Sequence, residues 1–139
     1  MSILLDTNVL SEVLRSAPSA SVLSWLSAQS PESLFVSAVT QAEMALGAGL
    51  LPVGKRRDAL QRALAALFEQ DFAGRVLPFD GDAVPSYVEV VVRRRSAGRP
   101  MSQFDAQIAA IARHHGASVA TRNIADFEGC GLTLVDPWE

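Results

Sequence analysis

The chain has 139 residues, of which 49% are hydrophobic and 19% charged, and its formal net charge is −3. This composition excludes a disordered chain and a strongly basic nucleic-acid-binding surface, and it predicts a single domain over residues 1–139. The lone cysteine, Cys130, excludes an intrachain disulfide and suits a reducing compartment. The first apolar run stops at Asp6, and no apolar stretch approaches the roughly 20 residues of a membrane span. We therefore expect a cytoplasmic protein with no membrane association.

Short apolar runs alternate with helical patterns along the chain. The predicted order is a strand at residues 3–5, helices at 6–15 and 19–26, a strand at 34–37, helices at 39–50 and 53–72, a strand at 75–79, helices at 82–97 and 102–115, and strands at 118–121 and 132–135. Gly47, Gly49 and Pro52 are expected to interrupt the helix at 39–50. Strands that alternate with helices predict an α/β protein, a three-layer α/β/α sandwich with a mainly parallel sheet of about five strands.

Four carboxylates occupy positions where a solvated surface charge is not expected. Asp6 ends the first strand, Asp105 lies in the first turn of a helix, and Asp126 follows the strand at 118–121. Glu43 lies on the apolar stripe of its helix, where an unpaired buried charge would be costly. Strand ends and helix starts in a parallel sheet converge on one edge. Carboxylates gathered there without basic partners repel one another, and a divalent cation is the usual way to hold them.

Each of these positions also has an ordinary structural explanation. Asp6 and Asn8 are common helix-capping residues, and residues 102–105 match the pattern of a capping box. Glu43 could reach water at the rim of a buried face or pair with an arginine. The segment 121–127 could be a polar loop that follows a strand. The residues alone leave both explanations open at every position.

A dense basic run ends the helix predicted at 82–97. It consists of Arg93, Arg94 and Arg95, with Arg99 just beyond. Cations at a helix C-terminus complement the helix dipole, which is one explanation, and contact with a phosphate backbone or an acidic partner is the other. The chain has no phosphate-binding P-loop, no dinucleotide-binding glycine motif and no nucleophilic serine elbow.

Four segments, taken in order, resemble the motifs of the PIN-domain family. They are ILLDTNVLSE at 3–12, SAVTQAE at 37–43, SQFDAQIAAIA at 102–112 and VATRNIADF at 119–127, and LVDPW at 134–138 is similar to the FitB-like branch. The resemblance implies a VapC-type toxin of a type II toxin–antitoxin pair. Such a protein is a small Mg²⁺-dependent ribonuclease, usually a homodimer, that a co-expressed antitoxin holds inactive and connects to DNA.

Residue by residue, the resemblance makes Asp6, Glu43 and Asp105 the expected ligands of Mg²⁺, which Mn²⁺ can replace. Many family members have an aspartate where Asn123 stands, so Asp126 is the expected fourth catalytic acid. Water acidified by a bound cation can attack phosphorus in line, and no covalent nucleophile is needed. We further expect substrate-positioning roles for four polar neighbours of these acids, and RNA or antitoxin binding for the basic run. The four neighbours are Asn8, Thr121, Arg122 and Asn123.

Two other functions match parts of this pattern. A phosphohydrolase of the haloacid-dehalogenase kind also begins with an aspartate after its first strand, but it needs an Asp-x-Asp pair and a later lysine. Here the pair is Asp6 and Asn8, and the sole lysine, Lys55, is predicted inside a helix. The second alternative is a binding module that kept the fold without catalysis and acts through an antitoxin-like DNA-binding partner. A cleavage assay with and without Mg²⁺ separates this module from the enzyme.

Overall fold

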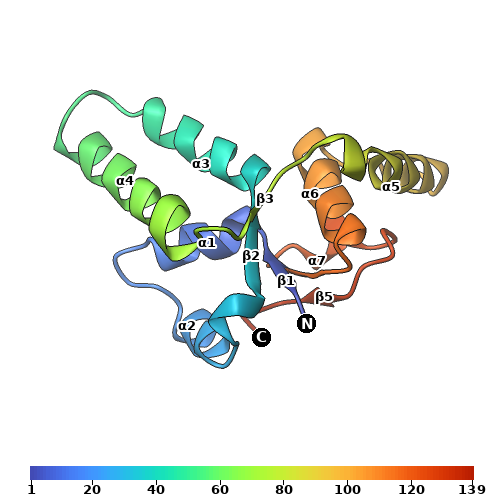
Figure 1. Cartoon of the computed structure of the whole chain (residues 1–139), viewed down its shortest axis with the longest axis horizontal. Helices are drawn as coiled ribbons and strands as arrows, with labels where there is room; N and C mark the ends of the chain where they lie inside the picture. Colours follow the sequence, from blue (N-terminus) through green and yellow to red (C-terminus); the bar gives the residue numbers. More distant parts are fainter.

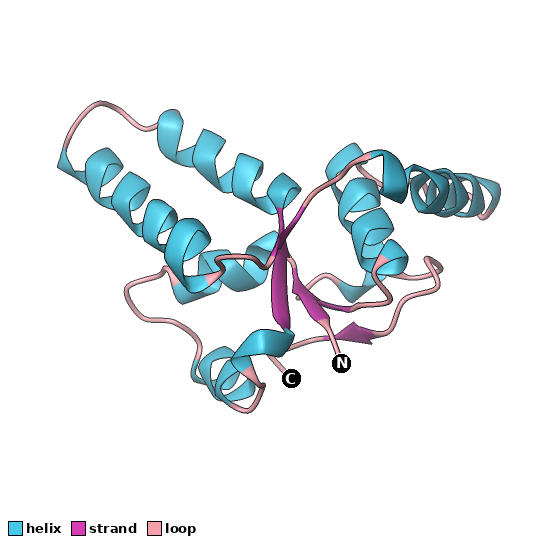
Figure 2. Cartoon of the chain, in the orientation of Figure 1, coloured by secondary structure: helices cyan, strands magenta, loops and turns pink.

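A five-stranded sheet forms the centre of the computed structural model, which describes all residues from Met1 to Glu139. The strand order is β3-β2-β1-β4-β5, and every neighbouring pair is parallel. The strands are β1 (Ile3–Leu5), β2 (Leu34–Ser37), β3 (Val76–Leu77), β4 (Ser118–Ala120) and β5 (Leu134–Val135). Helices lie on both sides of this sheet (Figures 1 and 2), which confirms the predicted three-layer α/β/α sandwich.

Helices α1, α2 and α4 lie on one side of the sheet, and α5 and α6 lie on the other (Figure 1). The α-helices are α1 (Thr7–Val13), α2 (Ala20–Ser27), α3 (Ala38–Gly49), α4 (Lys55–Ala66), α5 (Val84–Ser96), α6 (Gln103–His114) and α7 (Ile124–Phe127). Short 3₁₀ turns at Pro31–Ser33 and Gly81–Ala83 precede β2 and α5. None of these helices has the length and apolar character needed to cross a lipid bilayer.

The central strand, β1, contributes side chains to two hydrophobic cores, one on each face of the sheet. Ile3 and Leu5 pack with residues of α1, α2 and α4, whereas Leu4 packs with residues of α5 and α6, including Val90 and Ile108. Side chains alternate between the two faces of a strand, and both faces of β1 are covered. This double burial explains why β1 is apolar at every position.

The α-helix predicted at residues 53–72 is shorter than expected, and its last part is π-helical. A π-helical turn, Leu67–Asp71, follows the end of α4, and the Phe72 N–H donates to the Leu67 carbonyl, five residues back, at 2.9 Å. Leu67, Phe68 and Phe72 are all buried. The wider turn therefore lets all three side chains pack into the core, and tertiary packing overrides the regular α-helical period.

The apolar stripe predicted on α3, at Val39, Ala42, Leu46 and Leu50, is only partly the buried face of that helix. Leu46 and Leu50 are 60% and 75% exposed, whereas Val39 and Ala48 are buried. The predicted interruption at Gly47 is also wrong, because a glycine costs a helix only about 1 kcal/mol and α3 continues through it. The three- and four-residue spacing of apolar residues on α3 therefore does not by itself identify which side chains are buried.

The strand order places a topological switch point beside β1. Within the sheet, β2 and β3 lie on one side of β1, and the chain then returns to place β4 and β5 on the other side of β1. In open parallel sheets, ligands bind outside the carboxyl ends of the strands at such a point. Asp6 follows β1 there, and Thr121 follows β4. The fold thus brings the first and fourth predicted motifs together.

Candidate active site at the switch point of the sheet

Asp6 serves both as a helix cap and as part of the predicted site. Its Oδ1 accepts a hydrogen bond from the backbone N–H of Thr7 at 2.8 Å and so caps α1. Its Oδ2 accepts a hydrogen bond from the hydroxyl of Thr121 at 2.7 Å. Asp6 is only 6% exposed, and these two bonds fix its orientation. The capping role and the site role are therefore compatible at this residue.

Glu43 is held by a chain of hydroxyl groups and not by an arginine. The Thr7 hydroxyl donates to Glu43 Oε1 at 3.0 Å and lies 2.9 Å from the Thr40 hydroxyl. Because Thr7 uses its single hydroxyl hydrogen on the carboxylate, Thr40 donates to Thr7. Thr40 is fully buried, and its N–H donates to Ser37 Oγ, the cap of α3, at 3.0 Å. The network runs from the end of β2, through α1, to Glu43.

Sequence reasoning misses Thr7 and Thr40. The available signal is their spacing, since Thr7 directly follows Asp6 and Thr40 lies three positions before Glu43 on the same side of α3. This signal is weak, because a threonine in the first turn of a helix usually has only a local role. Only the packing of α1 against α3 shows that the two hydroxyls meet.

Asp105 approaches the same edge from the first turn of α6. Ser102 is the N-cap of this helix, and its hydroxyl accepts a hydrogen bond from the Asp105 N–H at 3.1 Å. Ser102 therefore satisfies the end of the helix, as the capping pattern predicts. The Asp105 carboxylate is half-buried and remains available to the space beyond the helix start.

A cavity of about 500 Å³ opens where these elements meet, and Asp6, Glu43 and Asp105 all line it. Its other walls are mainly polar and come from Thr7, Asn8, Ser11, Glu12, Arg15, Arg122, Asn123 and Trp138. Asp126 is exposed on α7 and does not line the cavity. Three of the four predicted catalytic acids thus share one cavity, and at the fourth position Asn123 lines the wall instead of Asp126.

Burial raises the pKa of both Asp6 and Asp105 and is the largest cause of the shift at each. Two hydrogen bonds oppose the shift at Asp6, whereas the charges of Glu43 and Asp126 add to it. The charge of Asp6 is the second cause of the raised pKa of Asp105. No ion pair with lysine or arginine compensates any of these four carboxylates. The acids therefore repel one another across the cavity.

The donor set fits a hard divalent cation that keeps part of its water shell. Carboxylate oxygens are the ligands that Mg²⁺ and Mn²⁺ prefer, and a bound cation would relieve the repulsion between Asp6 and Asp105. No three acidic, histidine or cysteine side chains form a ready-made metal site. Mg²⁺ binds proteins through one or two carboxylates and retains several waters, so this spacing is compatible with it.

Thr121 supports Asp6 and does not form part of the cavity wall. It is fully buried, and its hydroxyl donates to Asp6 while accepting from the Asn8 amide at 3.3 Å and from the Asn123 N–H at 3.1 Å. A buried hydroxyl with these three partners has no access to a substrate. The structure therefore corrects the predicted substrate-positioning role of Thr121, which orients a carboxylate instead.

Arg122, Asn123 and Trp138 form one side of the cavity. Arg122 and Asn123 are exposed, and the guanidinium carbon of Arg122 lies 5.1 Å from the centroid of the Trp138 ring, in a cation–π arrangement. Sequence reasoning misses Trp138, because a single tryptophan without a surrounding motif is more simply explained as a packing residue.

The basic run is not a uniform surface patch. Arg94 is 6% exposed, and its guanidinium donates to three backbone carbonyls, so the predicted binding role is wrong for this residue. Arg93 and Arg95 are exposed, and their binding role stays a prediction. Arg99 is exposed as well but already contacts a carbonyl and a glutamate of the protein. None of the four lines the acidic cavity.

The family model of the PIN domain matches residues 3–128. The chain is 47% identical to the plasmid stability protein StbB of Pseudomonas syringae pv. tomato over 99% of both chains. It is 44% identical to VapC ribonuclease Y4jK of Sinorhizobium fredii, over 99% of this chain and 98% of that protein. It is also 38% identical to Toxin FitB of Neisseria gonorrhoeae, over 98% of each.

Solved structures share the same architecture. FitAB bound to the IR36 DNA fragment superposes with a TM-score of 0.92 at 38% identity, over 99% of this chain and 96% of that one. FitAcB from Neisseria gonorrhoeae superposes with a TM-score of 0.89 at 36% identity, over 99% of each chain. These matches exclude the haloacid-dehalogenase alternative. Because they extend over nearly the whole chain, the protein belongs to the PIN-domain family, in the branch that contains VapC and FitB.

Proposed function

We propose that this protein is a Mg²⁺-dependent endoribonuclease and the toxin of a type II toxin–antitoxin pair. The observation that carries the proposal is the cavity in which Asp6, Glu43 and Asp105 meet without an ion pair to lysine or arginine. Relatives named VapC ribonuclease and Toxin FitB match nearly the whole chain and support the same function.

The residues of the chain have three roles in this proposal. Asp6, Glu43 and Asp105 would hold the cation, in part through water molecules that it retains, and the bound cation would supply the charge that acidifies water and neutralises the phosphate. The hydroxyls of Thr7 and Thr121 keep the carboxylates in place before RNA arrives, so that little reorganisation is needed during the reaction. At the rim, the exposed guanidinium of Arg122 offers a positive charge to the RNA backbone.

Hydrolysis adds water across one P–O bond of the phosphodiester. The water oxygen bonds to phosphorus, the bond to the departing sugar oxygen breaks, and that oxygen takes up a proton. The proton that water loses needs an acceptor, and Glu43 Oε2, which makes no hydrogen bond within the protein, is free to accept it. The reaction requires no serine, cysteine or histidine nucleophile. The cavity contains no cysteine or histidine, and its one serine, Ser11, is not hydrogen-bonded to a general base.

The proposal extends to the partners of the protein. FitAB, a solved relative, is bound to a DNA fragment, and we expect an antitoxin to connect this chain to DNA in a similar way. A neighbouring reading frame for a small DNA-binding protein with a flexible tail would support the pairing. We also expect a homodimer, which light scattering on the purified protein measures directly.

Cleavage of RNA by protein freed of antitoxin tests the enzymatic part. The wild-type protein should cut RNA in Mg²⁺ or Mn²⁺ and stop in EDTA, and an Asp105→Asn protein purified in parallel controls for contaminating nucleases. Cleavage that continues in EDTA, or that the variant shares, contradicts the proposal. An intact protein that cuts no RNA in Mg²⁺ favours the binding module over the enzyme.

A further inference from the structure

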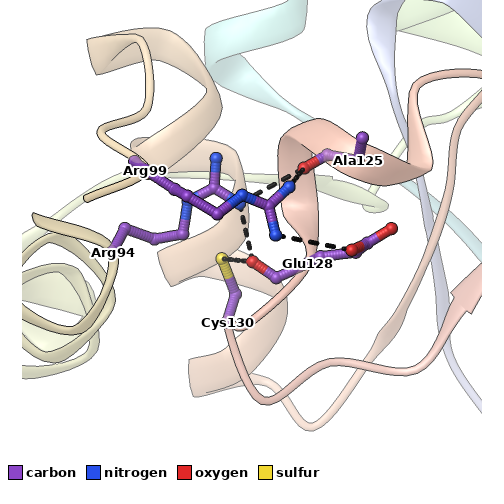
Figure 3. Close-up of polar contacts among 5 residues, drawn as sticks. All are labelled: Arg94, Arg99, Ala125, Glu128 and Cys130. Atoms are coloured by element: carbon purple, nitrogen blue, oxygen red, sulfur yellow. Dashed lines mark hydrogen bonds and ion pairs between the residues drawn. The ribbon is translucent and has the colours of Figure 1, made fainter. Parts of the chain in front are cut away.

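Arg94 is the buried member of the basic run, and its side chain extends from α5 toward the segment that contains α7. Its Nε donates to the carbonyl of Arg99 at 2.6 Å. Its Nη1 donates to the carbonyls of Glu128 at 2.6 Å and Ala125 at 3.3 Å (Figure 3). One guanidinium therefore ties together the loop after α5 and the segment around α7.

Arg99 contacts the same segment from the solvent side. Its Nη2 donates to the Ala125 carbonyl at 3.0 Å, and its Nη1 lies 3.5 Å from Glu128 Oε2. The Ala125 carbonyl therefore receives hydrogen bonds from both arginines (Figure 3). We call this set of interactions, from Arg94 and Arg99 to Ala125 and Glu128, the arginine clamp.

The clamp holds a helix that is too short to be stable by itself. α7 has only four residues, and isolated helices shorter than about 12 residues are marginal in water. Its N-cap, Asn123, makes no capping hydrogen bond through its side chain. The N-terminal end of α7 nevertheless forms part of the acidic cavity, because Asn123 lines it, and Asp126 lies between the two clamped carbonyls.

We propose that Arg94 is a positioning residue for RNA cleavage, because the arginine clamp fixes α7 and thereby places Asn123 in the wall of the acidic cavity. This inference rests on the proposed function and adds a residue to it that does not touch the RNA. A guanidinium suits the task, since its planar set of five N–H donors can reach several carbonyls at once. A lysine carries the same charge but concentrates it at one point.

Arg94→Lys is therefore the informative variant, and Arg62→Lys is its matched control. Arg62 lies on α4, is exposed, and makes no side-chain hydrogen bond or ion pair within the protein. At saturating RNA, the rate constant should fall by up to about 100-fold in Arg94→Lys, the loss that a displacement of about 1 Å caused by a substitution far from the chemistry can produce. KM and its salt dependence should stay at wild-type values, and the control should match the wild type throughout.

Amide hydrogen exchange supplies a readout that is independent of activity. Exchange at residues 123–130 should accelerate in Arg94→Lys while the amides of the five strands keep their protection. If Arg94→Lys does not fold, Arg99→Lys should show a smaller change in the same segment, because Arg99 is exposed and its replacement does not open the core.

Three results overturn the inference. Faster exchange throughout the protein would show that Arg94 supports overall stability. A raised KM with weaker salt dependence would show that Arg94 binds RNA. Wild-type rates together with wild-type exchange would show that the arginine clamp does not position α7. If the wild-type protein itself cuts no RNA, the proposed function fails together with the cleavage role of Arg94. Hydrogen exchange then still decides whether the clamp holds α7.

Discussion

The acidic cavity and the arginine clamp contain equally buried charges that are stabilised in different ways. Asp6 and Arg94 are each 6% exposed. Asp6 faces other carboxylates, and burial together with their charges raises its pKa. Arg94 instead meets three carbonyl oxygens that accept its hydrogen bonds. Burial of a charge therefore does not by itself identify a site. Like charges that meet without forming an ion pair indicate a site for a cation.

Replacing an acid of the cavity should have the largest effect on function. In Asp105→Asn, single-turnover cleavage should fall by about 100- to 1000-fold, because an electrostatic contribution to the transition state is removed. Circular dichroism should show an intact fold, since Ser102 and not the Asp105 carboxylate caps α6. Asp6→Asn should lose activity similarly.

Asp126→Asn is the matched control for these variants, because it removes the same charge from a residue outside the cavity wall. Its activity should fall less than that of Asp105→Asn. Equal losses would place Asp126 in the reaction, and wild-type cleavage by both Asp6→Asn and Asp105→Asn would leave Asp6 as a helix cap only and remove Asp105 from the reaction.

Thr40→Val should have a smaller effect through Glu43. The variant keeps the shape of the buried side chain but removes the hydroxyl that donates to Thr7. Removal of one hydrogen bond should lower the free energy of unfolding by about 1 kcal/mol, measured by urea denaturation. Cleavage should fall by about tenfold, the lower end of the range for residues that orient metal ligands.

A second substitution separates orientation from stability in this network. Thr40→Ser retains a hydroxyl and should recover cleavage, although it leaves a small cavity in the core. Recovery of stability without recovery of cleavage would show that the hydroxyl chain does not orient Glu43.

The exposed arginines of α5 should contribute to binding and not to the chemical step. In a protein with Arg93→Ala and Arg95→Ala, the slope of log affinity for single-stranded RNA against log salt should become shallower by up to about 1.4, or about 0.7 for each phosphate that is no longer neutralised. Cleavage at saturating RNA should remain at the wild-type rate. The double variant Lys55→Ala and Arg56→Ala removes the same charge from exposed positions on α4 and serves as the control. A slower chemical step with unchanged affinity would place Arg93 or Arg95 in the active site.

The sequence predicts the layers of the fold well, because each central strand is a short apolar run that only a doubly covered sheet explains. It also predicts that Asp6, Glu43 and Asp105 converge, since they follow strands or open helices at one edge. It does not predict which neighbours orient them. The hydrogen bond between Asp6 and Thr121 joins residues 115 positions apart, and no local pattern encodes it.

The basic run shows the same limit more clearly. Four arginines at the end of a helix match a solvated or nucleic-acid-binding surface, and nothing in the run distinguishes Arg94 from Arg93 or Arg95. The partners of Arg94 include carbonyls 31 and 34 positions away, in and beside a four-residue helix that propensity alone does not predict. Backbone carbonyls have no sequence signature, so a buried arginine that binds them is recognised only in the folded chain.

The smallest expected effect is on the pH dependence of stability in the absence of metal. The pKa of Asp105 is raised in the folded protein above its unfolded value of about 3.9. At pH values between the unfolded and the folded pKa, the folded protein therefore binds more protons than the unfolded protein. Stability from this group is therefore present below the unfolded pKa and is lost as the pH rises through the folded pKa. Asp105→Asn removes the titrating group, and in EDTA it should be more stable than the wild type at pH 7.

This difference should shrink as the pH falls toward 4, because the wild-type carboxylate becomes neutral as well. Mg²⁺ should also reduce this difference in stability, because a cation bound in the wild-type cavity stabilises the folded wild-type protein by mass action. Urea denaturation at several pH values, with EDTA or Mg²⁺, measures both trends. The Arg62→Lys protein should follow the wild type in every condition, because Arg62 is exposed on α4 and does not line the cavity. An Asp105→Asn protein that is less stable than the wild type at pH 7 in EDTA would show that the carboxylates of the cavity do not oppose folding, and the contrast with the arginine clamp would then disappear.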